Sequence, residues 1–335
     1  IKQEEEHLGL MAVGYYAILE TALRAKKNLS IDEHKKYLGK MYSEFSKIAA
    51  ANPGGWSEKD LSWQDIAMVN KKNTIQALPY NKFHCTSWNV NQASAMILCS
   101  EEIADELNIP KSKRIYPLAS SETNHMIAAI QRPNLIKPTG LKLAAEYILN
   151  ICHENNIKPN TYELYSCFPV AVQMFAEVLS LQDNEKLTVT GGMSFAGGPL
   201  NNYMIHSTVK MLEDIRSTPS KIGLVTGVSG MMTKQAFALW AKDPLINFTS
   251  KDVTSEAAAI ERPKDISNLN EGTGVIIGYT VLPKNHKEEE KSVMYIEDTN
   301  GDRKVLISYD KDTLKKMGEE EWVGKSIKFK GDYLV

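Results

Sequence analysis

The stretch TGGMSFAGGPLNNY, which runs from Thr190 to Tyr203, decides how the rest of the chain is interpreted. Its glycines stand in two pairs, Gly191-Gly192 and Gly197-Gly198, which allow the backbone to pass close to a ligand or to another strand. Pro199 suits the first turn of the helix that residues 200–216 are predicted to form. The free N–H groups at the start of that helix are able to hold an anion or a thioester oxygen. A tight strand-to-helix turn that binds nothing is the competing interpretation.

Two further segments carry residues suited to chemistry. ELYSCFP, at 163–169, ends a predicted strand and precedes a predicted helix, the place where α/β sheets carry their sites. There Tyr165 is suited to be a general acid or a hydrogen-bond donor. Cys167 is suited to be a nucleophile where its thiolate is favoured, and the competing interpretation is an inert buried cysteine. IGLVTGVSGMMT, at 222–233, is a buried-type strand that runs into a glycine-rich bend.

Composition limits the classes of function. The chain has 335 residues and a net charge of −2, so no global charge attracts nucleic acid or an anionic membrane. Its 4 cysteines show no CxxC spacing, which supports neither zinc nor a disulfide framework and indicates a reducing compartment. No apolar run approaches the roughly 18 residues of a membrane span. Because the chain opens at Ile1 without a methionine or a signal-peptide pattern, we expect it to start inside a longer, cytoplasmic protein, with peroxisome and mitochondrion left open.

The periodicity of apolar residues divides the chain into four regions. Residues 1–84 are predicted to form a helical region, 85–242 to alternate strands and helices in a layered α/β fold, 243–271 to be a polar linker, and 272–335 to form a small barrel of the OB type. The Asn300-Gly301 pair predicts a hairpin turn in the last region. Within 85–242 the pattern predicts helices at 92–107, 138–155, 170–180 and 200–216, and strands at 114–119, 162–166, 187–190, 222–226 and 233–241.

By order and spacing, these segments resemble the C-terminal half of the thiolase family. Where that family carries Asn-Glu-Ala-Phe, or His-Asp-Cys-Phe in its sterol-carrier type, this chain has YSCF at 165–168. Gly197-Gly198-Pro199 stands at the family's Gly-His-Pro turn, and 226–230 stands at its Cys-x-Gly loop. NVNQASA, at 89–95, is similar to the segment that closes the family's N-terminal half. The helical region and the barrel are similar to those of mycobacterial-type thiolase-like proteins, usually named acetyl-CoA acetyltransferases.

The resemblance implies an α/β fold class: the C-terminal half of a thiolase-like layered αβαβα sandwich, with the last strand and helix of the N-terminal half, plus a small all-β OB-like barrel. It implies that the N-terminal half of the sandwich is absent and has to come from the same or a separate chain. It also implies acyl-CoA as the partner, with a coenzyme A thioester as substrate or ligand and with neither cofactor nor metal. A homo-oligomer stays open, whereas neither nucleic acid nor a membrane span is expected.

The resemblance also assigns the residues of the site. Its catalytic positions fall on Tyr165 and Cys167. Its substrate- and CoA-binding positions fall on Ser166, Gly197, Gly198, Pro199, Asn201, Asn202, Gly227 and Ser229. His125 is added as a substrate-binding candidate because it follows a predicted strand end that faces the expected site. The departures matter as much as the matches: Gly198 stands where the family has its catalytic histidine, and no cysteine stands near Gly227, where the family has its acid/base cysteine.

Ordinary thiolase chemistry needs a thiolate, a base that forms it and a second acid/base group, and at least two of these are missing from the matching positions. We therefore expect an acyl-CoA-binding, acetyl-CoA acyltransferase-like protein of lipid metabolism that has lost the catalytic histidine and the second cysteine. Two alternatives stay open: a thiolase-like retro-aldolase that uses Tyr165, and a non-catalytic scaffold for CoA thioesters or lipids. OB-type barrels also bind single-stranded nucleic acid, but the acidic runs at 288–290 and 319–321 oppose this.

Overall fold

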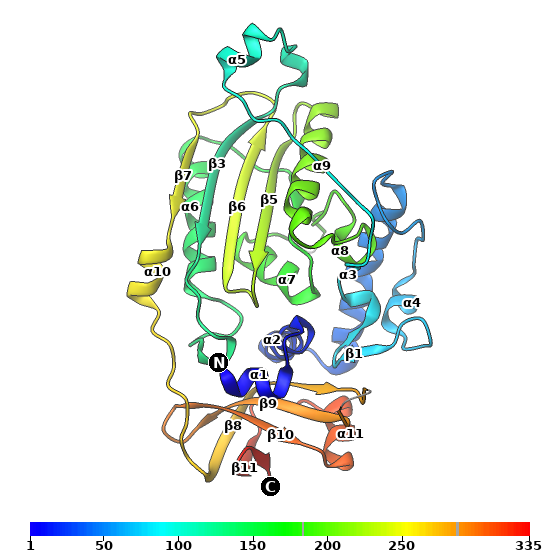
Figure 1. Cartoon of the computed structure of the whole chain (residues 1–335), viewed down its shortest axis with the longest axis vertical. Coiled ribbons are helices and arrows are strands. Elements are labelled where there is room, and N and C mark those ends of the chain that lie inside the picture. Colours follow the sequence, from blue (N-terminus) through cyan, green and yellow to red (C-terminus); the bar gives the residue numbers. More distant parts are fainter. Residues whose placement is uncertain (183, 286–287) are drawn as a thin grey trace.

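A mixed sheet of five strands lies at the centre of the computed structural model, which describes residues 1–182, 184–285 and 288–335 (Figure 1). Its strands are β3 Tyr116–Thr123, β4 Thr161–Glu163, β5 Ile222–Ser229, β6 Lys234–Ala241 and β7 Thr249–Asp252. They lie in the order β4-β5-β6-β3-β7. β6 runs antiparallel to both of its neighbours, while the edge strands β4 and β7 run parallel to β5 and β3.

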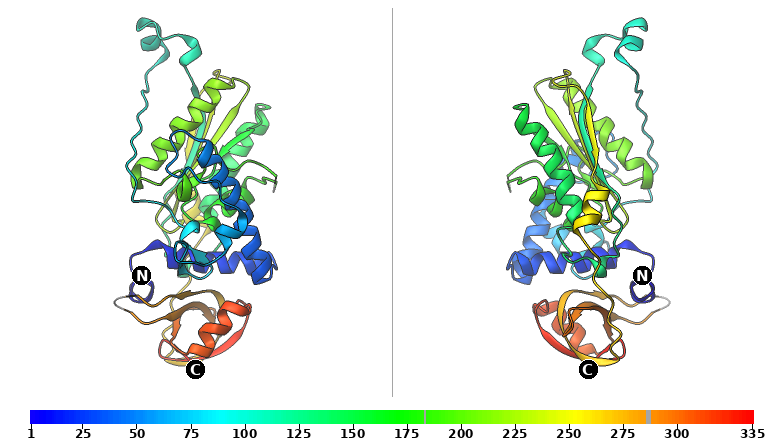
Figure 2. Two further views of the ribbon diagram at one scale, coloured as in Figure 1. Left: turned by 90° about the vertical axis from the view of Figure 1, so that its right-hand side faces the viewer. Right: turned by 90° about the vertical axis from the view of Figure 1, so that its left-hand side faces the viewer.

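Helices cover both faces of this sheet (Figure 2). α6 (Thr139–Glu154) and α7 (Pro169–Val178) lie on one face, where Ser121 Oγ of β3 donates to the carbonyl of Ala144 at 2.7 Å. α9 (Tyr203–Ser217) lies on the other face, over β5. It approaches so closely that a Cβ at Gly223 would lie 2.3 Å from the sulfur of Met211. Beyond α9, the same face carries an open groove of about 390 Å³ over β3, β6 and β7.

The N-terminal residues form a helical region beside and below the sheet (Figure 1). Its elements are α1 Lys2–Leu8, α2 Ala12–Lys26, α3 Ile31–Ala51, α4 Trp63–Ala67, β1 Ile75–Ala77, β2 Tyr80–Asn81 and the 3₁₀ turn η1 Lys82–His84. The expected capping box starts α3, because Glu33 N donates to Ser30 Oγ at 3.3 Å and Ser30 N donates to Glu33 Oε2 at 2.9 Å. α2 is buried on most sides, since it lies between α7 and a strand of the C-terminal barrel.

The C-terminal strands close into a small barrel. They are β8 Glu271–Leu282, β9 Lys291–Asp298, β10 Arg303–Ser308, β11 Ser326–Lys330 and β12 Tyr333–Leu334, in the order β10-β12-β11-β8-β9. The predicted hairpin is confirmed: Asn300-Gly301 joins the antiparallel strands β9 and β10, and Gly301 has a φ of +85°. The helix α11 (Lys311–Glu319) was not expected, because residues 272–335 were predicted to be all-β. Asp310 caps this helix by accepting a hydrogen bond from Thr313 N at 2.8 Å.

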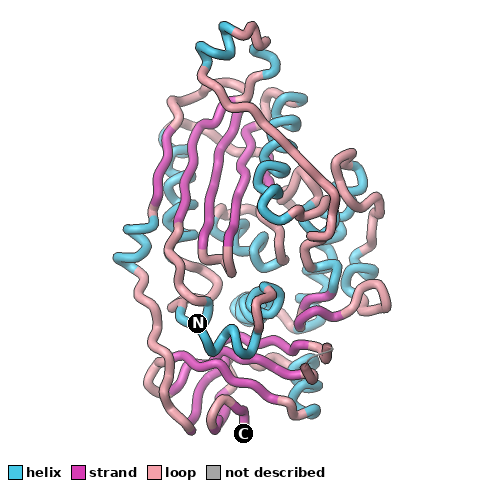
Figure 3. The backbone as a smooth tube through the Cα atoms, viewed as in Figure 1, coloured by secondary structure: helices cyan, strands magenta, loops and turns pink. Residues whose placement is uncertain are grey.

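The predicted helix 92–107 is wrong over most of its length. Residues 91–100 have no regular secondary structure, and the helical part is α5 (Glu101–Glu106) (Figure 3). Ile103 N donates to Ser100 Oγ at 3.3 Å, so the capping serine sets the start of the helix. The exposed fractions of Ile97 and Leu98 are 90% and 70%. The apolar pattern of this segment is real, but no described element covers it.

Two further segments differ from expectation. Residues 187–190 do not form a strand, because the N–H groups of Val189 and Thr190 donate to the carboxylate of Glu163 instead of to a sheet neighbour. Residues 243–271, interpreted above as a linker, contain β7 and the helix α10 (Thr254–Ile260). β7 adds to the edge of the sheet beside β3, and Ala257 of α10 is buried. The other boundaries between the four regions stay predictions.

The barrel is docked on the helical region and does not hang from a free tether. Thr21 Oγ1 of α2 donates to the carbonyl of Tyr279 at 2.8 Å and accepts from Tyr279 N at 2.9 Å. Gly278 lets β8 approach α2, because an added Cβ would lie 2.8 Å from the carbonyl oxygen of Ile18. Barrel side chains such as Tyr295 belong to the same apolar core as the sandwich. We therefore expect barrel and sandwich to unfold together.

Thr21→Val tests this docking. Valine has the shape of threonine but leaves the buried N–H and C=O groups of Tyr279 without their partner, so we expect a loss of about 2–3 kcal/mol in the free energy of unfolding. The measurement is urea unfolding followed by circular dichroism, with the exposed Thr218→Val as the control. A barrel that unfolds in its own earlier transition, unaffected by Thr21→Val, would contradict the shared core.

Candidate functional site

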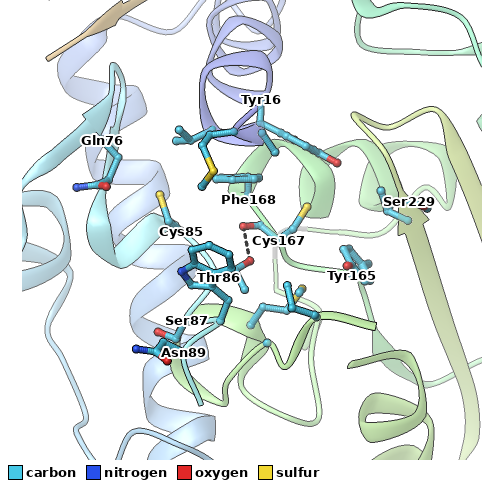
Figure 4. Close-up of a pocket in the computed structure, with 18 of the residues that line it drawn as sticks. Tyr16, Gln76, Cys85, Thr86, Ser87, Asn89, Tyr165, Cys167, Phe168 and Ser229 are labelled. Atoms are coloured by element: carbon cyan, nitrogen blue, oxygen red, sulfur yellow. Dashed lines mark hydrogen bonds between the residues drawn. The ribbon is translucent and has the colours of Figure 1, made fainter. Parts of the chain in front are cut away.

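One pocket of about 700 Å³ collects residues from the helical region, the sheet and the glycine-rich segment; it is called the site pocket below (Figure 4). Five of the residues assigned from the sequence line it: Tyr165, Cys167, Gly198, Asn201 and Ser229. The volume lies within the range of about 300–1,000 Å³ that is typical of small-molecule sites. Three segments that are far apart in the sequence therefore meet as expected, and their roles in chemistry stay predictions.

The other assigned residues lie elsewhere. Ser166 Oγ is buried behind the pocket and accepts from Met193 N at 2.9 Å, and Asn202 Oδ1 accepts from Ser94 Oγ at 3.3 Å. His125 faces α10 and not the pocket, because its Nε2 lies 3.2 Å from the carbonyl oxygen of Glu261. Gly227 lines the groove beside α9, as expected where a strand must let a helix approach. Gly197 and Pro199 do not line the pocket.

The carboxylate of Glu163, at the end of β4, organises the segment that leads into the pocket. It is fully buried and accepts hydrogen bonds from Val189 N at 2.7 Å, Thr190 N at 2.9 Å and Tyr203 Oη at 2.7 Å. The hydroxyls of Thr188 and Thr190 add two more, each at 2.9 Å. Burial raises the pKa of this carboxyl, and the hydrogen bonds oppose the rise. β4, the glycine segment and α9 are thus held by one side chain.

Residues 190–198, called the glycine turn below, follow directly and need their glycines. Gly191 has a φ of +101° and packs on α3, where a Cβ would lie 2.3 Å from the backbone nitrogen of Ala49. Asn52 Nδ2, just after α3, donates to the carbonyl of Thr190 at 2.9 Å. Gly198 has no room for a side chain, since a Cβ would lie 2.3 Å from Thr86 Cγ2. The turn therefore packs against the helical region and Thr86 only because Gly191 and Gly198 have no side chains.

Residues 86–100, called the strap below, form an extended segment that is hydrogen-bonded to the glycine turn. Ser87 N donates to the carbonyl of Met193 at 3.0 Å, and Gly198 N donates to the carbonyl of Ser87 at 2.9 Å. Gln92 Nε2 donates to the carbonyl of Ala196 at 2.7 Å. Thr86 Oγ1 donates to the carbonyl of Cys167 at 3.0 Å (Figure 4). These bonds make the strap one wall of the site pocket.

The thiols at the pocket are not activated. Burial raises the pKa of Cys167 to about 12, although the neighbouring Tyr16 hydroxyl opposes the rise. Burial also raises the pKa of Cys85 to about 12. A nucleophilic cysteine needs a lowered pKa from a cation, a base or a helix N-terminus. Burial, together with Cys167, raises the pKa of Tyr165 as well, so its phenol stays protonated and able to donate.

Tyr16 is a pocket residue that the motifs do not reveal. It comes from α2, and its hydroxyl donates to the carbonyl of Gly230 at 2.9 Å and accepts from Met232 N at 3.2 Å. Its ring stacks on Phe168 with centroids 4.6 Å apart. Only its place in a helix that is apolar nearly all round marks Tyr16 in the sequence. It ties the bend after β5 to the strand end that carries Cys167.

A buried polar cluster lies behind the pocket. Glu20 accepts from Tyr80 Oη at 2.6 Å and from Gln173 Nε2 at 2.7 Å, and it pairs with His34 Nε2 at 2.8 Å. Burial opposes ionisation of Glu20, but these hydrogen bonds outweigh it and lower its pKa. His84 is buried nearby, with its Nδ1 accepting from the backbone N–H of Asn81 at 3.1 Å. Burial lowers the pKa of His84 to about 4.

Among the residues that the structure describes, no group of three His, Cys, Asp or Glu side chains is placed to hold a metal ion. None of the helices in the described part of the chain is long and apolar enough to cross a bilayer.

Comparisons with known proteins bear on the fold. No protein-family model and no curated protein matches the chain. Among solved structures, a monomeric SCP2-thiolase-like protein type 1 from Mycobacterium smegmatis is 23% identical with a TM-score of 0.87, over 100% of this chain and 75% of that one. An Ltp2–ChsH2(DUF35) aldolase is 14% identical with a TM-score of 0.54, over 71% and 65%. The dimeric peroxisomal thiolase of Saccharomyces cerevisiae is 14% identical with a TM-score of 0.45, over 72% and 63%.

The fold is therefore that of the thiolase superfamily, with a small closed barrel appended to it. This confirms the predicted α/β class and the predicted OB-like barrel. Since the identity to each of these structures is below 25%, the likeness concerns the fold alone.

Gly191→Ala tests the packing of the glycine turn. The new Cβ would meet the backbone of Ala49 at a φ of +101°, so we expect a loss of about 3 kcal/mol or more in the free energy of unfolding. Gly324→Ala is the matched control, because Gly324 has a φ of +87° and nothing within 4 Å of its added Cβ. It should cost about 1–2 kcal/mol, the backbone term alone. Equal losses in urea unfolding would show that Ala49 moves aside.

His84 predicts a pH dependence of stability. Its folded pKa of about 4 lies below the unfolded value of 6.5, so the unfolded chain binds the proton more tightly, and stability is lost as the pH falls from 6.5 towards 4. The full loss from this group is about 3 kcal/mol. Urea midpoints measured between pH 7 and 4.5 should therefore depend less on pH in His84→Gln than in the parent or in the exposed His153→Gln. Parallel curves for all three proteins would refute a neutral buried His84.

Proposed function

We propose that the site pocket binds acyl-CoA thioesters and that this chain is a thiolase-like protein without ordinary thiolase activity. The observation that supports this most is the meeting of Tyr165, Cys167 and Gly198 in one pocket of about 700 Å³. Tyr165 and Cys167 belong to one motif, and Gly198 belongs to a second motif that follows about 30 positions later. Only the fold brings the two motifs into one pocket. A CoA thioester would place its reactive carbon at the buried end of this pocket.

The loss of thiolase activity follows from Gly198. It stands where the thiolase pattern has its catalytic histidine, and a side chain there would collide with Thr86 and Met193. The strap is thus built around the absence of that histidine. Cys167 and Cys85 remain as thiols, because burial raises the pKa of each to about 12. Among the described residues that line the pocket, none is suited to supply the base or the thiolate that thiolysis needs, and the family's nucleophilic cysteine belongs to the missing half of the sandwich.

A retro-aldolase is the second candidate, and Tyr165 favours it. Retro-aldol cleavage of a β-hydroxyacyl thioester breaks the Cα–Cβ bond, passes the proton of the hydroxyl to solvent water at the open side of the pocket and returns a proton from the Tyr165 phenol, which regains one from solvent, to the α-carbon. A protonated phenol at the pocket is suited to donate to the developing enolate. One solved structure of similar fold is described as an aldolase. A scaffold that binds CoA thioesters without reaction is the remaining alternative.

We also propose that the groove beyond α9, over β3, β6 and β7, receives the missing half of the sandwich, from the same or a separate chain. The groove beside α9 is lined by small side chains of β6, Ala236 and Ala238, which leave room for a covering layer. The strap runs along the outer side of α9 (Figures 1 and 2), and its Ile97 and Leu98 are exposed. An extended apolar segment of this kind can join the edge of another sheet.

Binding and cleavage can be separated with Tyr165→Phe. We expect acetyl-CoA to bind the parent and the variant with dissociation constants within about twofold in calorimetry, because one hydroxyl and almost no packing is removed. If the aldolase alternative holds, cleavage of a β-hydroxyacyl-CoA should fall about a hundredfold or more in the variant. The exposed Tyr309→Phe, outside the pocket, should leave both unchanged.

Acetyl-CoA that fails to bind the parent protein would overturn the proposed function. Robust thiolysis of acetoacetyl-CoA would overturn the claim that thiolase activity is lost. An unchanged cleavage rate in Tyr165→Phe would make Tyr165 a structural residue, and absence of any cleavage would favour the scaffold.

A further inference from the structure

A second cavity lies at the junction between the helical region and the barrel; it is called the junction cavity below. It has a volume of about 200 Å³ and is lined by residues of α2, α3, α4 and the β1–β2 segment and by Gly318 of α11. The turn between β1 and β2 holds the junction (Figure 1), because Leu78 N donates to the carbonyl of Val281 at 2.9 Å and Thr280 Oγ1 donates to the carbonyl of Leu78 at 2.8 Å. Sites for small molecules occur preferentially where two such parts of a protein meet.

The junction cavity has a buried floor and an exposed rim. At the floor, the exposed fractions of Arg24, His34 and His84 are 1%, 1% and 2%. At the rim, the exposed fractions of Val69 and Ile75 are 51% and 40%. Ionisable side chains that are buried at the base of an open cavity mark it as a candidate binding site, because their burial is otherwise costly.

The floor carries hydrogen-bond donors that lack acceptors. Arg24 donates from Nε to Glu321 Oε2 at 2.9 Å and from one terminal nitrogen to Tyr279 Oη at 2.7 Å, and no described residue accepts from its other terminal nitrogen. Asn81 N donates to Nδ1 of His84 at 3.1 Å, so the neutral imidazole has its proton on Nε2. No described residue accepts from that Nε2. The floor therefore favours a ligand with acceptor oxygens.

Charged and apolar side chains divide the rest of the junction cavity. Lys35 and Asp32, both exposed, line it with opposite charges, so neither sign dominates at the opening. Arg24 is therefore the cation that distinguishes ligands, because a guanidinium nitrogen without a partner matches a carboxylate oxygen. The apolar part of the wall includes Leu38, Ala67, Leu78 and Pro79.

Gly318 leaves the junction cavity open on the barrel side. It lies in the last turn of α11, although glycine is a poor helix former. Among the described residues, a Cβ added there has one neighbour within 4 Å, Leu78 Cδ1 at 4.0 Å, so no close contact requires glycine at this position. Because Gly318 and Leu78 both line the cavity, a larger side chain at position 318 would fill it.

We propose that the junction cavity binds a small monocarboxylic acid with an apolar body of about the size of a phenyl ring. The carboxylate lies against Arg24, and the apolar body lies against Leu38 and Leu78. A cavity of about 150 Å³ holds benzene, so about 200 Å³ has room for a ring and a carboxylate. Such a ligand touches both the helical region and the barrel, so its binding stabilises the docked state by mass action. The inference is independent of the proposed function, since the junction cavity and the site pocket share no lining residue.

Two other occupants compete with a carboxylic acid. Ordered water would also satisfy the donors of the floor. A neutral molecule of the same size would fill the apolar part of the cavity but would offer Arg24 only an uncharged, weaker acceptor. Benzoate and benzamide have nearly the same size and differ in charge, so comparing them separates a carboxylate site from a site for neutral molecules.

The test is a titration of the full chain with benzoate, followed by NMR of the histidine imidazoles. His34 and His84 line the cavity, so their signals should shift and saturate with a dissociation constant of about 1 mM or below, while the signal of the exposed His153 stays in place. Benzamide should bind about tenfold more weakly. Gly318→Leu should weaken benzoate binding about tenfold or more, because the new side chain fills the cavity. Lys315→Leu, which adds a leucine at an exposed position of α11, should leave benzoate binding unchanged.

Three results would overturn the proposal. If the signals of His34 and His84 show no saturable shift with benzoate, the cavity holds water alone. If benzamide binds the parent protein as tightly as benzoate, the carboxylate assignment is wrong; this comparison needs no variant. If benzoate binds Gly318→Leu as it binds the parent, with circular dichroism showing that the variant is folded, the ligand lies outside the junction cavity.

Discussion

The buried carboxylate of Glu163 is the group on which the candidate site depends. No cation of the described residues pairs with it, and a bare carboxylate in the interior is costly unless donors surround it. Five hydrogen bonds supply them, from the hydroxyls of Thr188, Thr190 and Tyr203 and from the N–H groups of Val189 and Thr190. The two N–H groups would otherwise be available to a strand ladder. One side chain at a strand end thus fixes the start of the glycine turn and the start of α9.

Close backbone contacts connect the glycine turn to the walls of the pocket. Gly191 rests on Ala49 of α3, so the helical region cannot shift without moving the turn. Gly198 bonds to Ser87 of the strap, and the strap in turn bonds to Cys167 through Thr86. The walls of the pocket are therefore not independent loops. They form a connected set of contacts, and glycine is required in it at positions 191 and 198.

Sequence patterns predicted the parts of this arrangement that local chemistry controls. The capping box at Ser30 and the hairpin at Asn300-Gly301 follow from short-range rules, whereas the meeting of the YSCF segment with the glycine turn was predicted from the family resemblance. Other parts depend on contacts that no short pattern records. Tyr16 reaches the pocket only because α2 is enclosed by the barrel and α7. The apolar residues at 91–99 have a pattern that suits a buried element, yet the described chain offers them nothing to cover.

The same burial that holds Glu163 in place also limits what the pocket can do. Removing Cys167 from water disfavours its thiolate, and no cation or base beside it restores the balance. Tyr165 is only partly buried and carries a proton that burial makes harder to lose, so it suits donation and not attack. Under the proposed function, this pocket would hold a thioester and Tyr165 would donate a hydrogen bond to it. Under the proposed function, Tyr165 would return the proton to the α-carbon in carbon–carbon cleavage, whereas neither thiol of the described pocket is suited to form an acyl-cysteine.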